Sequence, residues 1–184
     1  MTRVGEAVTY SFEFFPPKDQ EGETRLWSAI TALEPISPDF ISVTYGAGGS
    51  TRERTRDLVV QMRRETKIPP MAHLTCVGHT RAEIQDIIGA YVEAGVENVL
   101  ALAGDLPADG TDIPPSDYVY ATDLVEHLRS ITEMCIGVAA HPEGHPRSPD
   151  RATDRRHMAA KLQMADFATT QFFFEVEHYV RLVN

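Results

Sequence analysis

The stretch MAHLTCVGHTRAEIQDIIGAYVEAGVENVLALAGD, residues 71–105, contains a complete strand, helix and strand. Residues 71–77 are mostly apolar and read as a buried strand. Thr80 and Glu83 then form a capping-box pattern, which is typical of a helix start. Residues 98–104 return to strand character before Asp105. The helix between the strands carries apolar residues at helical spacing: Ile84, Ile87, Ile88, Tyr91 and Val92. This pattern predicts a right-handed βαβ unit with parallel strands.

The rest of the chain repeats this alternation, with a new strand roughly every 30 residues. The other expected strands are residues 8–15, 40–46, 135–140 and 167–174. The other expected helices are residues 21–34, residues 50–66, a helix carrying Leu124, Val125, Leu128 and Ile131, and a helix around 157–164.

Two architectures fit such a pattern, a doubly wound open sheet and a β/α barrel. No GxGxxG follows the first strand, which disfavours a dinucleotide-binding doubly wound sheet. Polar residues instead follow the carboxyl ends of the strands, where a barrel keeps its active site. We therefore predict an α/β fold of the (β/α)8 TIM-barrel class, forming one catalytic domain over residues 1–184. Since six βα units are visible and a closed barrel has eight, we expect the last two units to be absent from these residues.

Composition limits the classes of partner. The 184 residues are 42% hydrophobic and carry 17 basic against 27 acidic side chains, a formal charge of −10. This excess of acid disfavours nucleic acids and anionic membranes and leaves a small-molecule ligand as the expected partner. No apolar run has the length of a membrane span. The two cysteines are far apart in sequence, which suits a reducing compartment, so we predict a cytoplasmic location.

Two polar residues inside apolar strands are candidates for chemistry. Glu13 lies in SFEFFPP (residues 11–17), where burial among aromatic rings would favour its protonated form and suit a general acid. The alternative is a buried glutamate paired with an arginine. Gln171 lies in ATTQFFFE (residues 168–175), and a buried amide there must bond either to a ligand or to neighbouring backbone.

The histidines invite a zinc hypothesis. His73, Cys76 and His79 lie near one strand end, and HPEGH (residues 141–145) follows another. Pro142 and Pro146, however, prevent the helical i, i+4 geometry that presents paired histidines to zinc. We therefore predict no metal site.

Six segments in this order resemble the methylenetetrahydrofolate reductase family: SFEFFPPK, FISVTYGAGGSTRERT, AHLTC, GDLP, HPEGHP and TQFFFE. The resemblance implies a (β/α)8 barrel that reduces 5,10-methylenetetrahydrofolate to 5-methyltetrahydrofolate with NADH or NADPH. It implies that Glu13 protonates N10 of the folate, that Asp105 stabilises the resulting cation, and that Gln171 contacts folate and nicotinamide. Family members commonly self-associate, so a homo-oligomer is expected.

The resemblance also implies a set of positions that line the flavin and nicotinamide: Thr44, Tyr45, Ala47, His73, Gly104, Tyr120, Ala121, His141, His145, Asp154 and Lys161. This chain departs from the family at two flavin-lining positions, since Ala103 stands where the family usually has arginine and His141 where it has tyrosine. Our hypothesis is that FAD binds weakly or not at all and that NADH or NADPH delivers hydride directly. A conventional FAD-dependent reductase and a non-catalytic folate- or nucleotide-binding paralogue are the alternatives.

Overall fold

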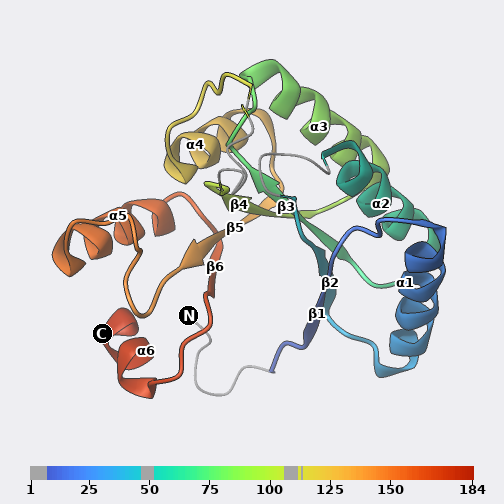
Figure 1. Ribbon diagram of the computed structural model, residues 1–184, viewed down its shortest axis with the longest axis horizontal. Helices are drawn as coiled ribbons and strands as arrows, with labels where there is room; N and C mark the ends of the chain where they lie inside the picture. The colour runs from blue at the N-terminus through green and yellow to red at the C-terminus, as the bar shows by residue number, and fades with distance from the viewer. Residues whose placement is uncertain (1–7, 47–51, 106–111, 113) are drawn as a thin grey trace.

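A computed structural model describes residues 8–46, 52–105, 112 and 114–184. Its six strands form one parallel sheet in the order β1-β2-β3-β4-β5-β6 (Figure 1). A doubly wound sheet reverses its strand order at a switch point, so this sequential order excludes that architecture. The strands are β1 (Ser11–Phe14), β2 (Phe40–Val43), β3 (Pro70–Thr75), β4 (Asn98–Leu102), β5 (Cys135–Ala140) and β6 (Phe167–Thr170).

The sheet curls, and the helices that connect its strands cover its outer face (Figure 1). The strands β1 and β6 form its two edges and face each other across the open side of the curve. The predicted fold class is therefore confirmed as a partial β/α barrel. The helices are α1 (Gln20–Leu33), the 3-10 turn η1 (Glu34–Ile36), α2 (Arg52–Glu65), α3 (Arg81–Ala94), α4 (Ala121–Ile131), α5 (Arg151–Leu162) and α6 (Val176–Val183).

Strand alternation separates a helix-facing core from the concave face of the sheet. Side chains that point toward the helices are fully buried and apolar, namely Ile41, Val43, Ala72, Leu74, Val99, Ala101, Ile136 and Val138. On the concave face, His73 is in register with Leu100, Leu100 with Gly137, and Gly137 with Phe167. A Cβ on Gly137 would lie 2.3 Å from Cζ of Phe167, so the glycine makes room for this ring.

The strands are shorter than predicted, because their last residues leave the sheet to form the loops at its carboxyl edge. The strand expected at 40–46 ends at Val43, and the one expected at 167–174 ends at Thr170. Helix α5 begins at Arg151, earlier than predicted, because the Asp150 side chain caps it by accepting from the Thr153 amide. Helix α6 was not predicted.

Helix α3 has the predicted capping box between Thr80 and Glu83. Four of its five predicted apolar residues are buried, but Val92 is exposed. No helix in the described ranges combines the length and the apolarity needed to cross a bilayer.

Candidate functional site

Glu13 projects from β1 onto the concave face, opposite Ser42 of β2. The Ser42 hydroxyl donates to Oε2 of Glu13 over 3.5 Å, and Nε2 of His73 lies 3.3 Å from the same oxygen. The Glu13 side chain is 53% exposed, so its predicted burial was wrong. The reason is that β1 is an edge strand of the described sheet, with a neighbour on one side only. Ser42 is a site residue that sequence analysis missed.

His73 lies beneath this carboxyl group and is 8% exposed. Burial lowers the pKa of its imidazole, and the negative charge of Glu13 opposes that shift. Its Nε2 is buried without a hydrogen bond of good geometry among the described residues, and the oxygen of Glu13 is its ion-pair neighbour. Burial therefore favours the neutral imidazole, and its Nε2 is directed at the carboxyl group.

Asp105 is carried out of the sheet by a turn at Gly104. The ladder between β3 and β4 continues one step past the strands, since the Val77 amide donates to the Ala103 carbonyl over 3.2 Å. Gly104 then adopts a φ of +85°, and a Cβ there would lie 2.8 Å from Cβ of Thr75. Glycine meets both constraints, because it tolerates positive φ and has no Cβ. The Asp105 side chain is consequently exposed at the carboxyl edge of the sheet.

A cavity of about 420 Å³ opens beside Asp105. It is lined by Asp105, by the loop after β5 and by the segment after β6, so it brings together the predicted site residues Asp105, His141, His145 and Gln171. Gln171 is exposed. Its backbone N–H donates to the Ala140 carbonyl, and its side-chain oxygen accepts from the backbone N–H of Phe172. The expectation of a buried amide was therefore wrong, since this residue follows the last paired position of an edge strand.

The loop after β5 is held by contacts between its own side chains and by hydrogen bonds to helix α5. The rings of His141 and His145 make an edge-to-face contact at 4.5 Å, and burial lowers the pKa of both. Asp154 accepts from the His145 amide over 3.2 Å and from the Ser148 hydroxyl over 3.1 Å. The Lys161 ammonium donates to the Ala139 carbonyl over 2.9 Å, and burial lowers its pKa.

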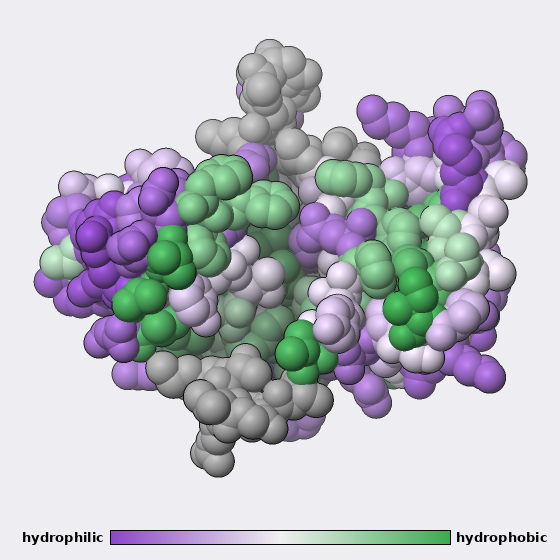
Figure 2. Space-filling view, turned by 90° about the horizontal axis from the view of Figure 1, so that it is seen from below, coloured by the Kyte–Doolittle hydropathy of each residue, from purple (hydrophilic) through white to green (hydrophobic). Residues whose placement is uncertain are grey.

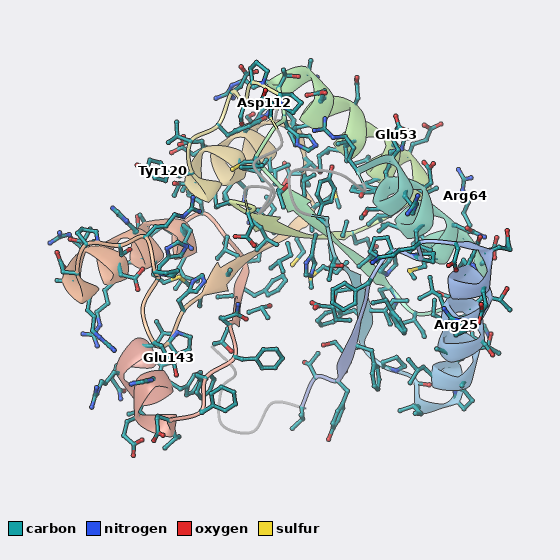
Figure 3. The ribbon with its side chains drawn as sticks, in the orientation of Figure 1. Arg25, Glu53, Arg64, Asp112, Tyr120 and Glu143 are labelled. Atoms are coloured by element: carbon teal, nitrogen blue, oxygen red, sulfur yellow. The ribbon has the colours of Figure 1, made fainter. Side chains whose placement is uncertain are left out.

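Helix α6 supports the same loop from the other side. Nδ1 of His178 lies 3.4 Å from a carboxylate oxygen of Glu143, and Figure 3 shows Glu143 near α6. The Phe173 and Tyr179 rings stack at 5.6 Å, which ties the helix to the segment after β6. The cavity wall therefore depends on an element that sequence analysis missed.

Tyr45 is engaged with His79. The Nδ1 of His79 lies 3.1 Å from the Val77 carbonyl, so this nitrogen carries the proton and Nε2 accepts from the Tyr45 hydroxyl over 2.9 Å. Burial lowers the pKa of His79 and raises that of Tyr45. Thr44 is held by backbone, because its amide donates to the Phe14 carbonyl and its carbonyl accepts from the Thr55 hydroxyl.

Two other predicted cofactor residues begin helix α4. Tyr120 lies beside α4 (Figure 3), is 65% exposed and is not in the lining of the cavity of Asp105. Ala121 is partly buried. Ala47 lies outside the described residues.

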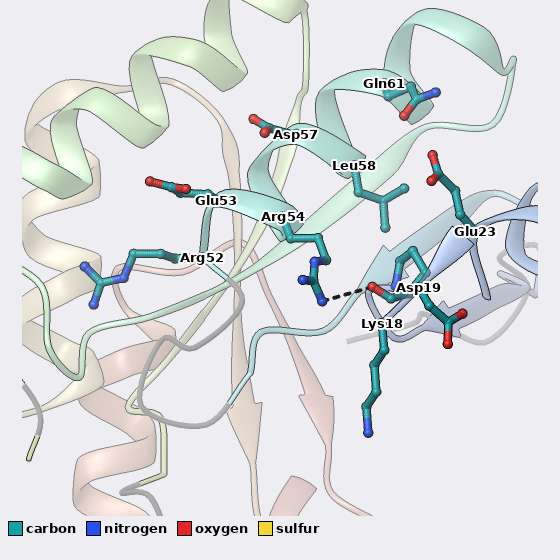
Figure 4. Close-up of a pocket in the computed structure, with 10 residues that line it drawn as sticks. Lys18, Asp19, Glu23, Arg52, Glu53, Arg54, Asp57, Leu58 and Gln61 are labelled. Atoms are coloured by element: carbon teal, nitrogen blue, oxygen red, sulfur yellow. Dashed lines mark hydrogen bonds between the residues drawn. The ribbon is translucent and has the colours of Figure 1, made fainter. Parts of the chain in front are cut away.

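A larger hollow of about 690 Å³ lies between the beginnings of α1 and α2 (Figure 4). Arg54 crosses it and donates to the Pro17 carbonyl over 3.1 Å. Its lining has three basic residues (Lys18, Arg52 and Arg54) and four acidic ones (Asp19, Glu23, Glu53 and Asp57). None of the catalytic or cofactor-binding residues predicted from the sequence is in this lining. Four of them line the smaller cavity, which is therefore the candidate functional site, and Glu13 and His73 are in neither lining.

Comparison with known proteins gives a consistent result. The family profile described as methylenetetrahydrofolate reductase matches residues 2–184. The 5,10-methylenetetrahydrofolate reductase of Salmonella typhimurium is 39% identical over 182 residues, which cover 98% of this chain and 60% of that protein. The Escherichia coli protein of the same name is 38% identical over 182 residues, with the same coverage.

A solved structure shares the fold. It is a Clostridium thermocellum protein described as binding two copies of 5-methyl-5,6,7,8-tetrahydrofolic acid, with a TM-score of 0.59 and 16% identity. The match covers 97% of this chain and 59% of that one. This chain therefore spans about three fifths of the length of the relatives named here. On the extent of the profile match and of the sequence identity, the chain belongs to the methylenetetrahydrofolate reductase family.

Proposed function

We propose that this chain carries the residues that reduce 5,10-methylenetetrahydrofolate to 5-methyltetrahydrofolate at the expense of NADH or NADPH. The observation that carries the proposal is the position of two carboxylates in a member of this family. Glu13 lies in β1, Asp105 follows β4 of the same parallel sheet, and Asp105 and the cavity beside it lie at the carboxyl edge of that sheet. Barrel enzymes keep their active sites at that edge.

The two carboxylates suit the two charges that the reaction must handle. The Glu13 carboxyl proton passes to N10 of the folate, the bond between N10 and the methylene carbon breaks, and a 5-iminium cation forms. Asp105 provides a negative charge for that cation. A hydride, with its two electrons, then adds to the methylene carbon and leaves oxidised nicotinamide. Glu13 finally takes up a proton from water, which balances the reaction.

The residues present do not fit a flavin site built on an arginine before the Gly-Asp turn. Ala103 packs against the core and offers only its carbonyl, which accepts from the Val77 amide and from the Cys76 thiol. Losing a guanidinium next to an anionic dinucleotide removes about 1.5–3 kcal/mol, or one to two decades of affinity.

The side chains assigned to the flavin by resemblance support the same conclusion. Tyr45, Asp154 and Lys161 direct their polar groups at partners within the protein. We therefore infer that the reduced nicotinamide transfers its hydride directly to the folate cation. Both reduced nicotinamides and reduced flavins are two-electron hydride donors, so the chemistry is the same.

The first experiment measures NADH and NADPH oxidation that depends on methylenetetrahydrofolate. Turnover with formation of 5-methyltetrahydrofolate supports a reductase. Folate binding without turnover would instead support the non-catalytic paralogue.

The second experiment separates the two hydride routes. Stereospecifically deuterated NADH should give complete deuterium transfer to the new methyl group in protein that lacks an absorbance band at about 450 nm. The Ala103→Arg variant should bind added FAD one to two decades more tightly than the natural chain. A stoichiometric flavin band in the purified natural chain would refute the direct route and leave the FAD-dependent reductase.

A further inference from the structure

The pair formed by Glu13 and His73 has a geometric asymmetry that the proposed reaction can use. Both polar contacts of the Glu13 carboxyl group among the described residues are made by Oε2: the Ser42 hydroxyl at 3.5 Å and Nε2 of His73 at 3.3 Å. Oε1 takes part in neither contact. The carboxyl group is thus held through one oxygen, and the other oxygen is available to a ligand.

The position of His73 is set by the sheet rather than by a flexible loop. It lies in the middle of β3, paired in register with Leu100 of β4, and is 8% exposed. Its Nε2 is buried and lacks a well-aligned hydrogen bond in the described part of the chain. Leaving a buried donor unpaired is costly, so this nitrogen needs a partner, and Oε2 of Glu13 is within reach of a small rotation of a half-exposed side chain.

The charge state of His73 decides what it can do to an acid. A positively charged imidazolium would favour the carboxylate form of Glu13 and would oppose proton donation. Burial lowers the pKa of His73, and Glu13 is the charged group that acts on it within the described residues. A neutral imidazole with its proton on Nε2 donates a hydrogen bond without adding a charge, so it can orient the carboxyl group of Glu13.

We propose that His73 is a positioning residue for Glu13. Together with Ser42 it donates to Oε2, which keeps this oxygen an acceptor and places the acidic proton on Oε1, facing the folate. This inference rests on the proposed function for its catalytic consequence, but the contact between the two side chains is testable without turnover.

The kinetic test compares His73→Leu with His73→Gln, because an amide can still donate to Oε2. We expect His73→Leu to lower kcat about 10- to 100-fold with the KM for NADH unchanged, and His73→Gln to restore kcat to within about threefold of the natural chain. His127→Gln is the matched control, since His127 is also 8% exposed but lies in α4, bonded to the Tyr118 hydroxyl. A rise in KM for NADH at constant kcat would overturn the proposal and make His73 a nucleotide contact.

The spectroscopic test needs no substrate. Imidazole ¹⁵N resonances of His73, identified by their loss in His73→Gln, should show a neutral ring protonated at Nε2 at pH 7. Glu13→Gln should lower the pKa of His73, because it removes the negative charge that raises it. Unchanged His73 resonances and titration in Glu13→Gln would refute the contact whether or not the protein is a reductase. An intact contact in an inactive protein would refute the proposed function alone.

Discussion

The two carboxylates of the candidate site are held in different ways. Glu13 is part of a strand, and its neighbours Ser42 and His73 come from the next two strands, so sheet register fixes their spacing. Asp105 follows the last paired residues of β4, and the residues around it come from loops after β5 and β6. Strand positions are set by a repeating ladder, whereas loop positions depend on individual turns and side-chain contacts.

The residues around the two carboxylates also differ in their exposure to solvent. His73 and Ser42 are buried, while Asp105 and Gln171 are exposed. In Figure 2 apolar surface lies on both sides of a hollow between the two halves of the molecule. The exposed apolar side chains near the two sheet edges are Val8, Tyr10, Phe12 and Phe15 by β1, and Phe172, Phe174 and Val176 after β6. Side chains at the centre of the sheet are therefore more buried than those near its two edges.

The largest expected effect is at the strand-held carboxyl group. Glu13→Gln removes the acidic proton with little change of shape, so we expect kcat to fall by about 10²- to 10⁴-fold. The measurement is folate-dependent NADH oxidation, with Glu93→Gln on the outer surface of α3 as the control. Turnover that survives the change would show that Glu13 is not the proton donor.

A somewhat smaller loss is expected at the loop-held carboxylate. Asp105→Asn removes the negative charge proposed to face the folate cation and should lower kcat about 10²- to 10³-fold. Asp86→Asn, an exposed position on α3, controls for the loss of a surface charge. An equal kcat in Asp105→Asn and the natural chain would remove Asp105 from the proposed mechanism.

The turn at Gly104 that positions Asp105 can be disrupted by a substitution that leaves the carboxylate itself unchanged. Gly104→Ala places a Cβ at positive φ and 2.8 Å from Cβ of Thr75, so we expect a loss of unfolding free energy of about 1–3 kcal/mol. Denaturant unfolding measures it, and Gly89→Ala is the control, because nothing lies within 4 Å of a Cβ there. Equal stability of the two variants would mean that the turn is not strained by a side chain.

The smallest effect concerns the scaffold behind the site and depends on pH. Burial lowers the pKa of His79 in the folded state, so below the unfolded value of about 6.5 the unfolded chain binds more protons. Stability from this group is complete above that pH and is lost as the pH falls toward the folded value. We expect acidification from about pH 7 to 5.5 to lower the unfolding free energy of the natural chain more than that of His79→Gln. Equal losses of unfolding free energy in the natural chain and in His79→Gln, measured by denaturant unfolding at the two pH values, would contradict this prediction.

Residues with a local signal were predicted well. The capping box of α3 depends on residues three positions apart, and most of the buried face of α3 follows from helical periodicity. The predictions that failed depend on distant neighbours. Glu13 and Gln171 look buried in sequence, but each lies on an edge strand or just beyond it, where pairing ends. Ser42 has no motif of its own and becomes a site residue only through its register with β1.

The sequence by itself determined the parallel β/α alternation and the polar residues that follow each strand, because both depend on local periodicity and on turn chemistry. It also indicated the family through six short segments in a fixed order. Only the tertiary structure decided that the sheet curls in sequential order, that His73 and Ser42 share one oxygen of Glu13, and that Asp105, His141 and Gln171 line one cavity. The physical reason is that these contacts join residues far apart in the chain, which only strand register and packing bring together.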